Sequence, residues 1–234
     1  MYIKNVYFST AYRMMTAIFL FYGILCHLSF TNPDITAHNI SFFTVQSNIF
    51  CFLCFYILIT QTLRGSKSTL TETKYAATLC IIVTFLCFHY AVVSAKTYNG
   101  GVLNLTMANF IAHYVAPTLV CLDWLLFTPK GRICWYSPVL WILAPMSYFF
   151  LIIIRALCHP PEAFASTGKY PYFFLNIDIV GTRVYIYVIA YLLFFLLLGY
   201  IFYAVDKLLY YCSKVHLPKY KSAESMVTPT SPLT

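Results

Sequence analysis

The sequence has few charged residues and very few acidic ones. Only 9% of its 234 residues are charged, and Asp and Glu together number 7. Soluble globular domains carry about 25% charged residues. The shortage of charge therefore excludes a water-soluble globule. What fills the chain instead is apolar, because 61% of the residues are hydrophobic and 19% are aromatic.

The hydrophobic residues gather into six long stretches. A hydrocarbon core of roughly 30 Å needs about 20 residues of α-helix to cross it. We therefore predict an all-α, polytopic membrane protein with six transmembrane helices in one domain, residues 1–216. A disordered cytoplasmic tail, residues 217–234, is expected to follow because it is rich in Ser, Thr, Pro and Lys. The predicted spans are residues 8–30, 41–62, 75–95, 107–127, 138–158 and 184–208.

The placement of basic residues predicts the orientation. With the N-terminus in the cytoplasm, the outer side holds only four of the 15 Lys and Arg residues: Lys96, Arg155, Lys169 and Arg183. This is a positive-inside bias, and six spans return the C-terminus to the cytoplasm. We predict an integral, multi-pass protein, of the cell (inner) membrane if the source is bacterial. Its basic cytoplasmic face favours anionic lipid and is not a nucleic-acid footprint. The sequence identifies no protein partner.

Two further absences narrow the class of protein. No internal repeat is visible, so an inverted-repeat transporter gains no support. No pair of cysteines falls in the predicted outer loops, although the chain has 9 cysteines, and we predict no disulfide bond. Cys51-x-x-Cys54 has redox or zinc spacing, but it lies in an apolar helix, where packing of small apolar side chains is the better interpretation.

Polar side chains on two predicted spans lie at similar depth near the outer side. Thr44 is about three residues into the second span and His113 about six residues into the fourth. At 1.5 Å per residue these depths are roughly 5 and 9 Å, so the two side chains can share one layer. Asn48 is at i+4 from Thr44 and Asn109 is at i−4 from His113, and each extends the polar stripe of its helix.

A threonine hydroxyl beside a histidine fits acyl transfer. The hydroxyl is an effective nucleophile when a base removes its proton during attack, and histidine suits that task near neutral pH. Thr44 is therefore the predicted nucleophile and His113 its base. Asn48, or free N–H groups at the start of the span, are candidates for holding the oxyanion. Asn109 or Asp178 are candidates for orienting the imidazole. No cofactor and no metal ion belong to this prediction.

Other interpretations remain open. Thr44 and His113 can be structural, since such residues often bond their own i−4 carbonyl or a neighbouring helix. The chain would then be a lipid-binding, receptor-like or transport protein without chemistry. Alternatively, three outer histidines with Asp178 can ligate zinc in an intramembrane hydrolase, although no pair has i, i+4 spacing. The outer histidines are His27, His38, His89, His113 and His159.

Two charged residues within the spans have structural or binding interpretations. Asp123, near the inner end of the fourth span, is expected to anchor the helix by reaching Lys130 or Arg132, with a functional proton site as the alternative. Arg155, near the outer end of the fifth span, can bind the carboxylate head group of a substrate, because a guanidinium donates to both carboxylate oxygens. Extension of Arg155 to the membrane surface is the alternative.

Several motifs resemble those of a bacterial membrane-protein family. The run Phe43-Thr44-Val45-Gln46-Ser47-Asn48 resembles its FT-x-QSN stretch. The resemblance covers nearly the whole chain, and the element that begins at His113 and Pro117 is its most specific part. Further matching residues are Asp123-Trp124-Leu125-Leu126-Phe127, Pro129-Lys130-Gly131-Arg132, Trp141, Pro145, Tyr148, Arg155, Tyr170-Pro171-Tyr172, Asp178 and Gly181.

This family is similar to the androgen-induced (FAR-type) membrane hydrolases, the family that includes the androgen-dependent TFPI-regulating protein. Those proteins are six-span threonine hydrolases that cleave fatty acid esters of hydroxy fatty acids. The resemblance implies that Thr44 is the nucleophile, that His113 is its partner and that the substrate is a membrane lipid or fatty acid ester. The animal members differ around the threonine and lack the Asp-Trp-Leu-Leu-Phe run, so the resemblance leaves the substrate open.

Overall fold

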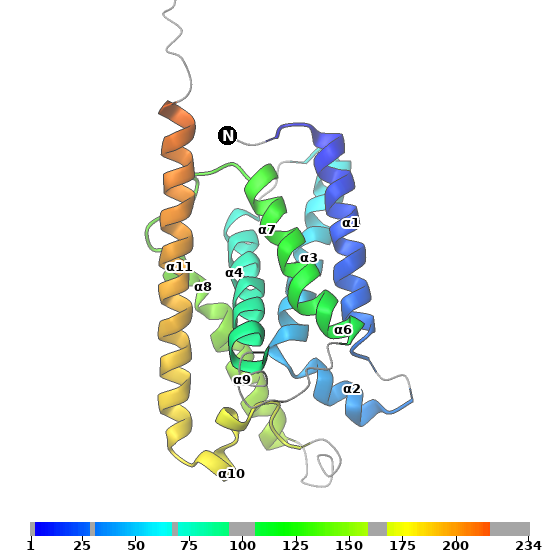
Figure 1. The fold of residues 1–234 in the computed structure, drawn as a ribbon, viewed down its shortest axis with the longest axis vertical. Helices are drawn as coiled ribbons and strands as arrows, with labels where there is room; N and C mark the ends of the chain where they lie inside the picture. The colour runs from blue at the N-terminus through cyan, green and yellow to red at the C-terminus, as the bar shows by residue number, and fades with distance from the viewer. Residues whose placement is uncertain (1–2, 29–30, 67–69, 94–105, 159–167, 216–234) are drawn as a thin grey trace, which may run out of the picture.

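The computed structural model describes residues 3–28, 31–66, 70–93, 106–158 and 168–215, and these residues contain helices and no β-strand. Six helices in this part of the chain are long and apolar enough to cross a membrane (Figure 1). The predicted all-α architecture with six membrane-spanning helices is therefore confirmed. The spans are Val6–Leu25, Phe43–Leu63, Thr71–Tyr90, Met107–Phe127, Ser137–Cys158 and Arg183–Lys214.

Some spans are single α-helices and others combine several helical elements. The single helices are α1 (Val6–Leu25), α3 (Phe43–Leu63) and α11 (Arg183–Val215). The composite spans are α4 (Thr71–Cys87) with the π-helical η1 (Phe88–Val93), α6 (Met107–Phe110) with the π-helical η2 (Ile111–Val115) and α7 (Ala116–Phe127), and α8 (Ser137–Trp141) with α9 (Leu143–Cys158). Short elements outside the spans are α2 (Pro33–Ile40), the 3-10 helix η4 (Phe173–Leu175) and α10 (Ile177–Val180).

Several helix ends differ from the predicted boundaries. The first helix ends at Leu25 rather than at residue 30, and the last reaches Val215 rather than residue 208. The unpredicted helix α2 begins after Asn32, whose side chain accepts from the N–H groups of Asp34 and Ile35. An Asn cap followed by proline is a strong helix start. The predicted disordered tail lies outside the described residues.

Helices α1, α3, α4 and α7 pack against one another (Figure 1). Their apolar core includes Leu20, Phe55 and Val120. Cys51 and Cys54 are buried in the same cluster, as small packing residues would be. Helix α11 lies at the side of this group, and most of its apolar surface is exposed. That exposure is what contact with lipid chains would produce.

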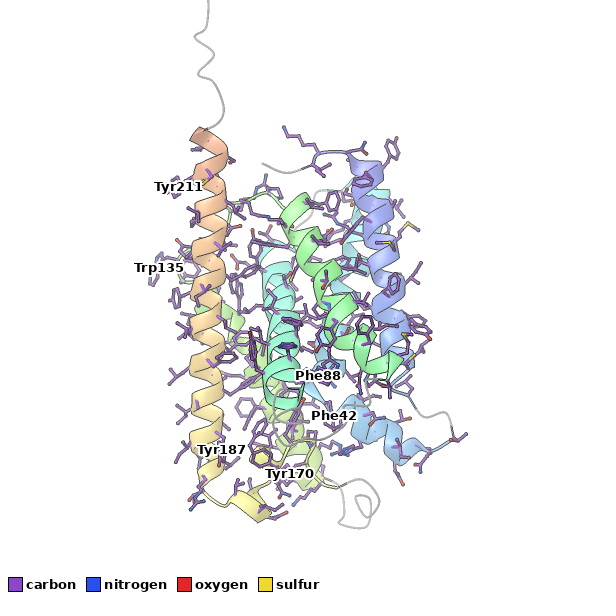
Figure 2. The ribbon with its side chains drawn as sticks, in the orientation of Figure 1. Phe42, Phe88, Trp135, Tyr170, Tyr187 and Tyr211 are labelled. Atoms are coloured by element: carbon purple, nitrogen blue, oxygen red, sulfur yellow. The ribbon has the colours of Figure 1, made fainter. Side chains whose placement is uncertain are left out.

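The first residues of α1 and the last residues of α11 lie at the same end of the molecule, at the top of Figure 1. Helices α2 and α10 lie at the opposite end, which we call the outer end to match the predicted orientation. Aromatic side chains occur toward both ends of the molecule (Figure 2). Phe42 and Tyr170 lie toward the outer end, and the exposed Trp135 and Tyr211 lie in the other half. The cytoplasmic location of the termini stays a prediction.

A buried ion-pair cluster joins three helices in the inner half. The Asp123 carboxylate is fully buried, lies 2.9 Å from Arg13 Nε on α1 and contacts Lys74 Nζ on α4. The expectation that Asp123 would reach Lys130 or Arg132 is therefore corrected: its partners come from neighbouring helices. Lys130 donates instead to backbone carbonyls that include Thr128 O, at 3.0 Å, near the end of α7. Burial lowers the pKa of Lys130 to about 8.

Candidate active site

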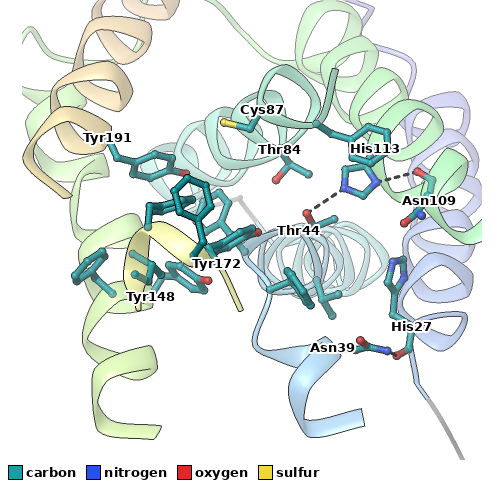
Figure 3. A pocket seen from close by; sticks show the side chains of 18 of the residues that line it. His27, Asn39, Thr44, Thr84, Cys87, Asn109, His113, Tyr148, Tyr172 and Tyr191 are labelled. Atoms are coloured by element: carbon teal, nitrogen blue, oxygen red, sulfur yellow. Dashed lines mark hydrogen bonds between the residues drawn. The ribbon is translucent and has the colours of Figure 1, made fainter. Parts of the chain in front are cut away.

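The structure brings Thr44 and His113 into contact near the outer end. Thr44 is the second residue of α3, and His113 is the middle residue of η2. The threonine Oγ1 lies 3.1 Å from the histidine Nε2, although the two residues are 69 positions apart in the chain (Figure 3). His113 is 6% exposed, whereas Thr44 is half-buried. A hydroxyl and an imidazole therefore meet at the shared layer that the depths predicted.

The second ring nitrogen of His113 determines which atom donates in this contact. His113 Nδ1 lies 2.9 Å from the backbone oxygen of Asn109. A carbonyl oxygen only accepts hydrogen bonds, so Nδ1 carries the proton of the neutral ring. Nε2 then presents a lone pair, and the Thr44 hydroxyl donates to it. This is the arrangement in which a histidine acts as general base toward a hydroxyl.

The helix that carries His113 is irregular for a reason visible in the sequence. Pro117 has no N–H, so the carbonyl of Ala112 lacks the donor that a π-helix would supply at i+5. The side-chain amide of Asn48 donates a hydrogen bond to this carbonyl instead, with Nδ2 3.3 Å from Ala112 O. Asn48 thereby joins α3 to η2 directly beside the two candidate residues.

Asn48 also fixes the backbone of Thr44, and this changes its predicted role. Its Nδ2 donates to Thr44 O at 2.8 Å, so both amide hydrogens point to carbonyls. Asn48 therefore has no hydrogen left to donate to an oxyanion in this arrangement. The Ser47 hydroxyl donates to the same Thr44 oxygen at 2.9 Å. Together these bonds hold the residue that carries the candidate nucleophile.

Aromatic stacking holds the imidazole from the other side. The Phe88 ring lies 3.8 Å from the His113 ring, centroid to centroid, at an angle of 23°. Phe88 is the first residue of η1, so a residue of each π-helix contributes to this pair. Isolated π-helical turns occur frequently at functional sites. The ring of His113 is thus fixed by one hydrogen bond at Nδ1 and one stacked face.

Thr44 and His113 line a largely apolar cavity of about 610 Å³. Its walls come from the beginning of α3, from η1 and η2, from α9 and α11, and from the segment that contains η4 (Figure 3). Cavities of roughly 300–1,000 Å³ with a few convergent polar groups are typical ligand sites. The aromatic part of the wall includes Phe42, Phe43, Phe88, Phe149, Phe173 and Phe174.

Asp178 and Arg155 are not among the residues that line this cavity. The Asp178 side chain is 66% exposed and its carboxylate lies 3.8 Å from Lys169 Nζ. The orienting bond to the imidazole comes from the backbone of Asn109, one of the two predicted candidates, and the structure gives Asp178 a different partner. Arg155 Nη1 donates to Lys169 O at 2.9 Å. Its head-group role stays a prediction.

The histidines are distributed among separate partners. In the described part of the chain, no three His, Cys, Asp or Glu side chains gather as a metal-binding group. His27 Nδ1 bonds Gly23 O at 2.7 Å, and His89 Nδ1 lies 3.2 Å from the Tyr114 hydroxyl. His159 lies outside the described residues. The positions of the described histidines give the zinc interpretation no support.

Tyr172 is a site residue that the sequence analysis did not select. It lines the cavity, and its hydroxyl points toward Thr44 (Figure 3). Burial raises the pKa of Tyr172 to about 12. Tyr172 precedes η4 in an irregular segment, so no helical spacing relates it to Thr44. The sequence signal for Tyr172 is its place in the Tyr-Pro-Tyr motif, which is part of the family resemblance.

Comparison with protein-family models, with curated proteins and with solved structures finds no match for this chain. The resemblance to the androgen-induced membrane hydrolases therefore stays a prediction.

Proposed function

We propose that this protein hydrolyses carboxylic esters of lipids within the membrane, with Thr44 as nucleophile and His113 as general base. The observation that carries the proposal is the 3.1 Å contact between Thr44 Oγ1 and His113 Nε2, in which the Asn109 carbonyl sets the tautomer. The pair borders a cavity large enough for a ligand. The candidate nucleophile, its base and the group that orients the base are thus linked by a chain of two hydrogen bonds.

Thr44 differs from other threonines of this chain. A helical threonine in a membrane commonly bonds the carbonyl four residues earlier. Thr44 is the second residue of α3, so no residue of this helix lies four positions before it. Its hydroxyl bonds His113 on another span instead. Among the described residues, threonines that bond the i−4 carbonyl include Thr10, Thr16, Thr62, Thr78 and Thr84.

In the first half of the proposed reaction, Thr44 Oγ1 attacks the ester carbonyl carbon as His113 Nε2 takes the hydroxyl proton. The carbonyl electron pair moves to oxygen and a tetrahedral intermediate forms. Its collapse breaks the bond to the alcohol oxygen, which receives the proton from His113. The alcohol leaves, and the acyl group remains as an ester of Thr44.

In the second half, water attacks the acyl carbon and gives one proton to His113. The bond between Thr44 and the acyl group breaks, the fatty acid leaves, and the proton returns to the threonine oxygen. Since His113 accepts and donates one proton in each half, no other titratable group is needed.

The cavity favours a substrate with a long apolar chain. Its wall between α9, α11 and η4 is formed by side chains such as Phe149, Val188 and Leu175. These residues would contact acyl carbons and exclude water, because burial of apolar surface is favourable. We propose fatty acid esters of hydroxy fatty acids as the substrate class, which is the class that the resemblance implies.

Turnover of such an ester by the purified protein tests the proposal. In detergent, we expect the wild-type protein to release fatty acid from a fatty acid ester of a hydroxy fatty acid, at a rate proportional to protein concentration. The matched analogue with an ether in place of the ester should bind but yield no acid. Saturable binding of both compounds without hydrolysis would contradict the proposal and favour the lipid-binding alternative.

A further inference from the structure

A second hydroxyl lies beside the candidate nucleophile. We propose that Tyr172 is a catalytic residue whose hydroxyl donates a hydrogen bond to the oxyanion formed when Thr44 attacks the ester. This inference rests on the proposed hydrolase function, and it supplies the oxyanion donor that Asn48 does not provide. It is carried by the position of the Tyr172 hydroxyl, which points toward Thr44 (Figure 3), and by the place of both residues in the cavity wall.

The direction of the Tyr172 hydroxyl is set by ring packing. The Tyr172 ring stacks on Phe174, with centroids 5.1 Å apart at 14°, and meets the edge of Phe42 at 5.4 Å and 87°. Figure 3 shows the hydroxyl pointing toward Thr44. The packed ring holds the phenol oxygen in place, so only a rotation of the O–H bond is needed for it to donate to the developing oxyanion.

Backbone groups at the start of α3 complete the proposed oxyanion site. The cap residue Phe42 offers no side-chain oxygen, and its carbonyl accepts from Val45 N and Gln46 N. The N–H groups of Phe43 and Thr44 lie at this helix start, close enough to the Tyr172 hydroxyl to affect its pKa. A substrate carbonyl oxygen beside Thr44 would take these two donors, and the Tyr172 O–H would turn to donate to the same oxygen.

The proposed step balances without a further reactant. As the bond between Thr44 Oγ1 and the carbonyl carbon forms, the carbonyl π pair becomes a negative charge on oxygen. Tyr172 donates a hydrogen bond to that oxygen and keeps its proton. A tyrosine phenol is protonated at neutral pH, and burial raises the pKa of Tyr172 further, to about 12. The charge disappears when the intermediate collapses.

Other tyrosines near the cavity cannot replace Tyr172. The Tyr148 hydroxyl donates to Ser41 O at 3.0 Å, so its proton is engaged away from the reaction centre. Tyr191, on α11, lies across the cavity from Thr44 in Figure 3. Tyr170 is two residues before Tyr172 and does not line the cavity, which makes it a matched control for removal of one hydroxyl.

Tyr172→Phe and Tyr170→Phe are to be compared with the wild type in ester hydrolysis. We expect Tyr172→Phe to lower kcat by about 10²–10³-fold, the loss typical of one oxyanion donor, with KM changed by less than about threefold. Tyr170→Phe should keep the wild-type kcat. A phosphonate transition-state analogue should bind Tyr172→Phe more weakly by a factor close to the fall in kcat/KM, while the ether analogue binds equally well.

The outcomes separate this inference from the proposed function. A Tyr172→Phe protein with wild-type kcat and wild-type phosphonate affinity would overturn the role of Tyr172 and leave the Thr44–His113 pair intact. Equal losses of phosphonate and ether affinity would also overturn it, because they would show a packing role. A wild-type protein that hydrolyses no ester would overturn the proposed function, and the inference with it.

Discussion

Thr44→Ala is expected to lower kcat/KM for ester hydrolysis by about 10⁴-fold or more, because the variant lacks the oxygen that forms the acyl intermediate. Thr44→Ser should keep a measurable rate, since a serine hydroxyl can also donate to His113 Nε2. Initial rates of fatty acid release by the two purified variants and the wild type provide the measurement.

The matched control for this change is Thr60→Ala. Thr60 lies near the other end of α3, and its hydroxyl donates to Ile57 O at 3.0 Å. Removal of that hydroxyl should leave the rate of hydrolysis unchanged. Thermal unfolding in detergent verifies that each variant is folded. Full turnover by folded Thr44→Ala would show that another group is the nucleophile.

His113→Ala is expected to cause a loss of similar size. Without the imidazole no group takes the Thr44 proton, and general-base catalysis alone contributes about 10²–10⁴-fold. Residues that act as one unit are strongly non-additive. The double variant with Thr44→Ala should therefore be no slower than the slower single variant. The measurement is kcat/KM for the two single variants and the double variant.

His89→Ala controls for removal of an imidazole near this end. His89 lies on η1 with its Nδ1 3.2 Å from the Tyr114 hydroxyl, and it does not line the cavity. The His89→Ala variant should retain the wild-type kcat/KM. A multiplicative loss in the double variant, equal to the product of the single losses, would contradict a Thr44–His113 unit.

The spans were predictable because hydrophobic length is a strong signal. The fourth span begins and ends at the predicted residues, Met107 and Phe127. The end of α1 was missed because apolar residues continue past Leu25 while the chain turns, with His27 bonded to Gly23 O. Helix α2 was missed although Asn32 and Pro33 are typical of a helix start. Hydrophobicity shows the spans, whereas caps and turns decide where they end.

A shared layer for Thr44 and His113 was predictable from depth, because two helices that enter from one side carry their residues to calculable levels. The roles of Asn48 and Asp178 could not be decided in that way. Asn48 donates to Ala112 O, which depends on the proline-linked π-turn of a different helix. Tyr172 lies in an irregular segment whose position is set by tertiary packing, so no periodicity indicated it.

Charge pairing was also decided by neighbouring helices rather than by sequence distance. Lys130 and Arg132 are near Asp123 in the chain, but its partners are Arg13 and Lys74. A buried carboxylate is stabilised only where cations and hydrogen bonds converge on it. Which cations can do so depends on the packing of α1 and α4 against α7, and a single sequence does not show that packing.

The most direct measurement is the site of covalent capture. The purified protein is treated with an alkyl fluorophosphonate, digested, and the modified peptide is sequenced by mass spectrometry. The proposed mechanism predicts one phosphonyl adduct on Thr44, lost in His113→Ala and retained in His89→Ala. An adduct on a different residue, or full inhibition of ester turnover while Thr44 stays unmodified, would contradict it.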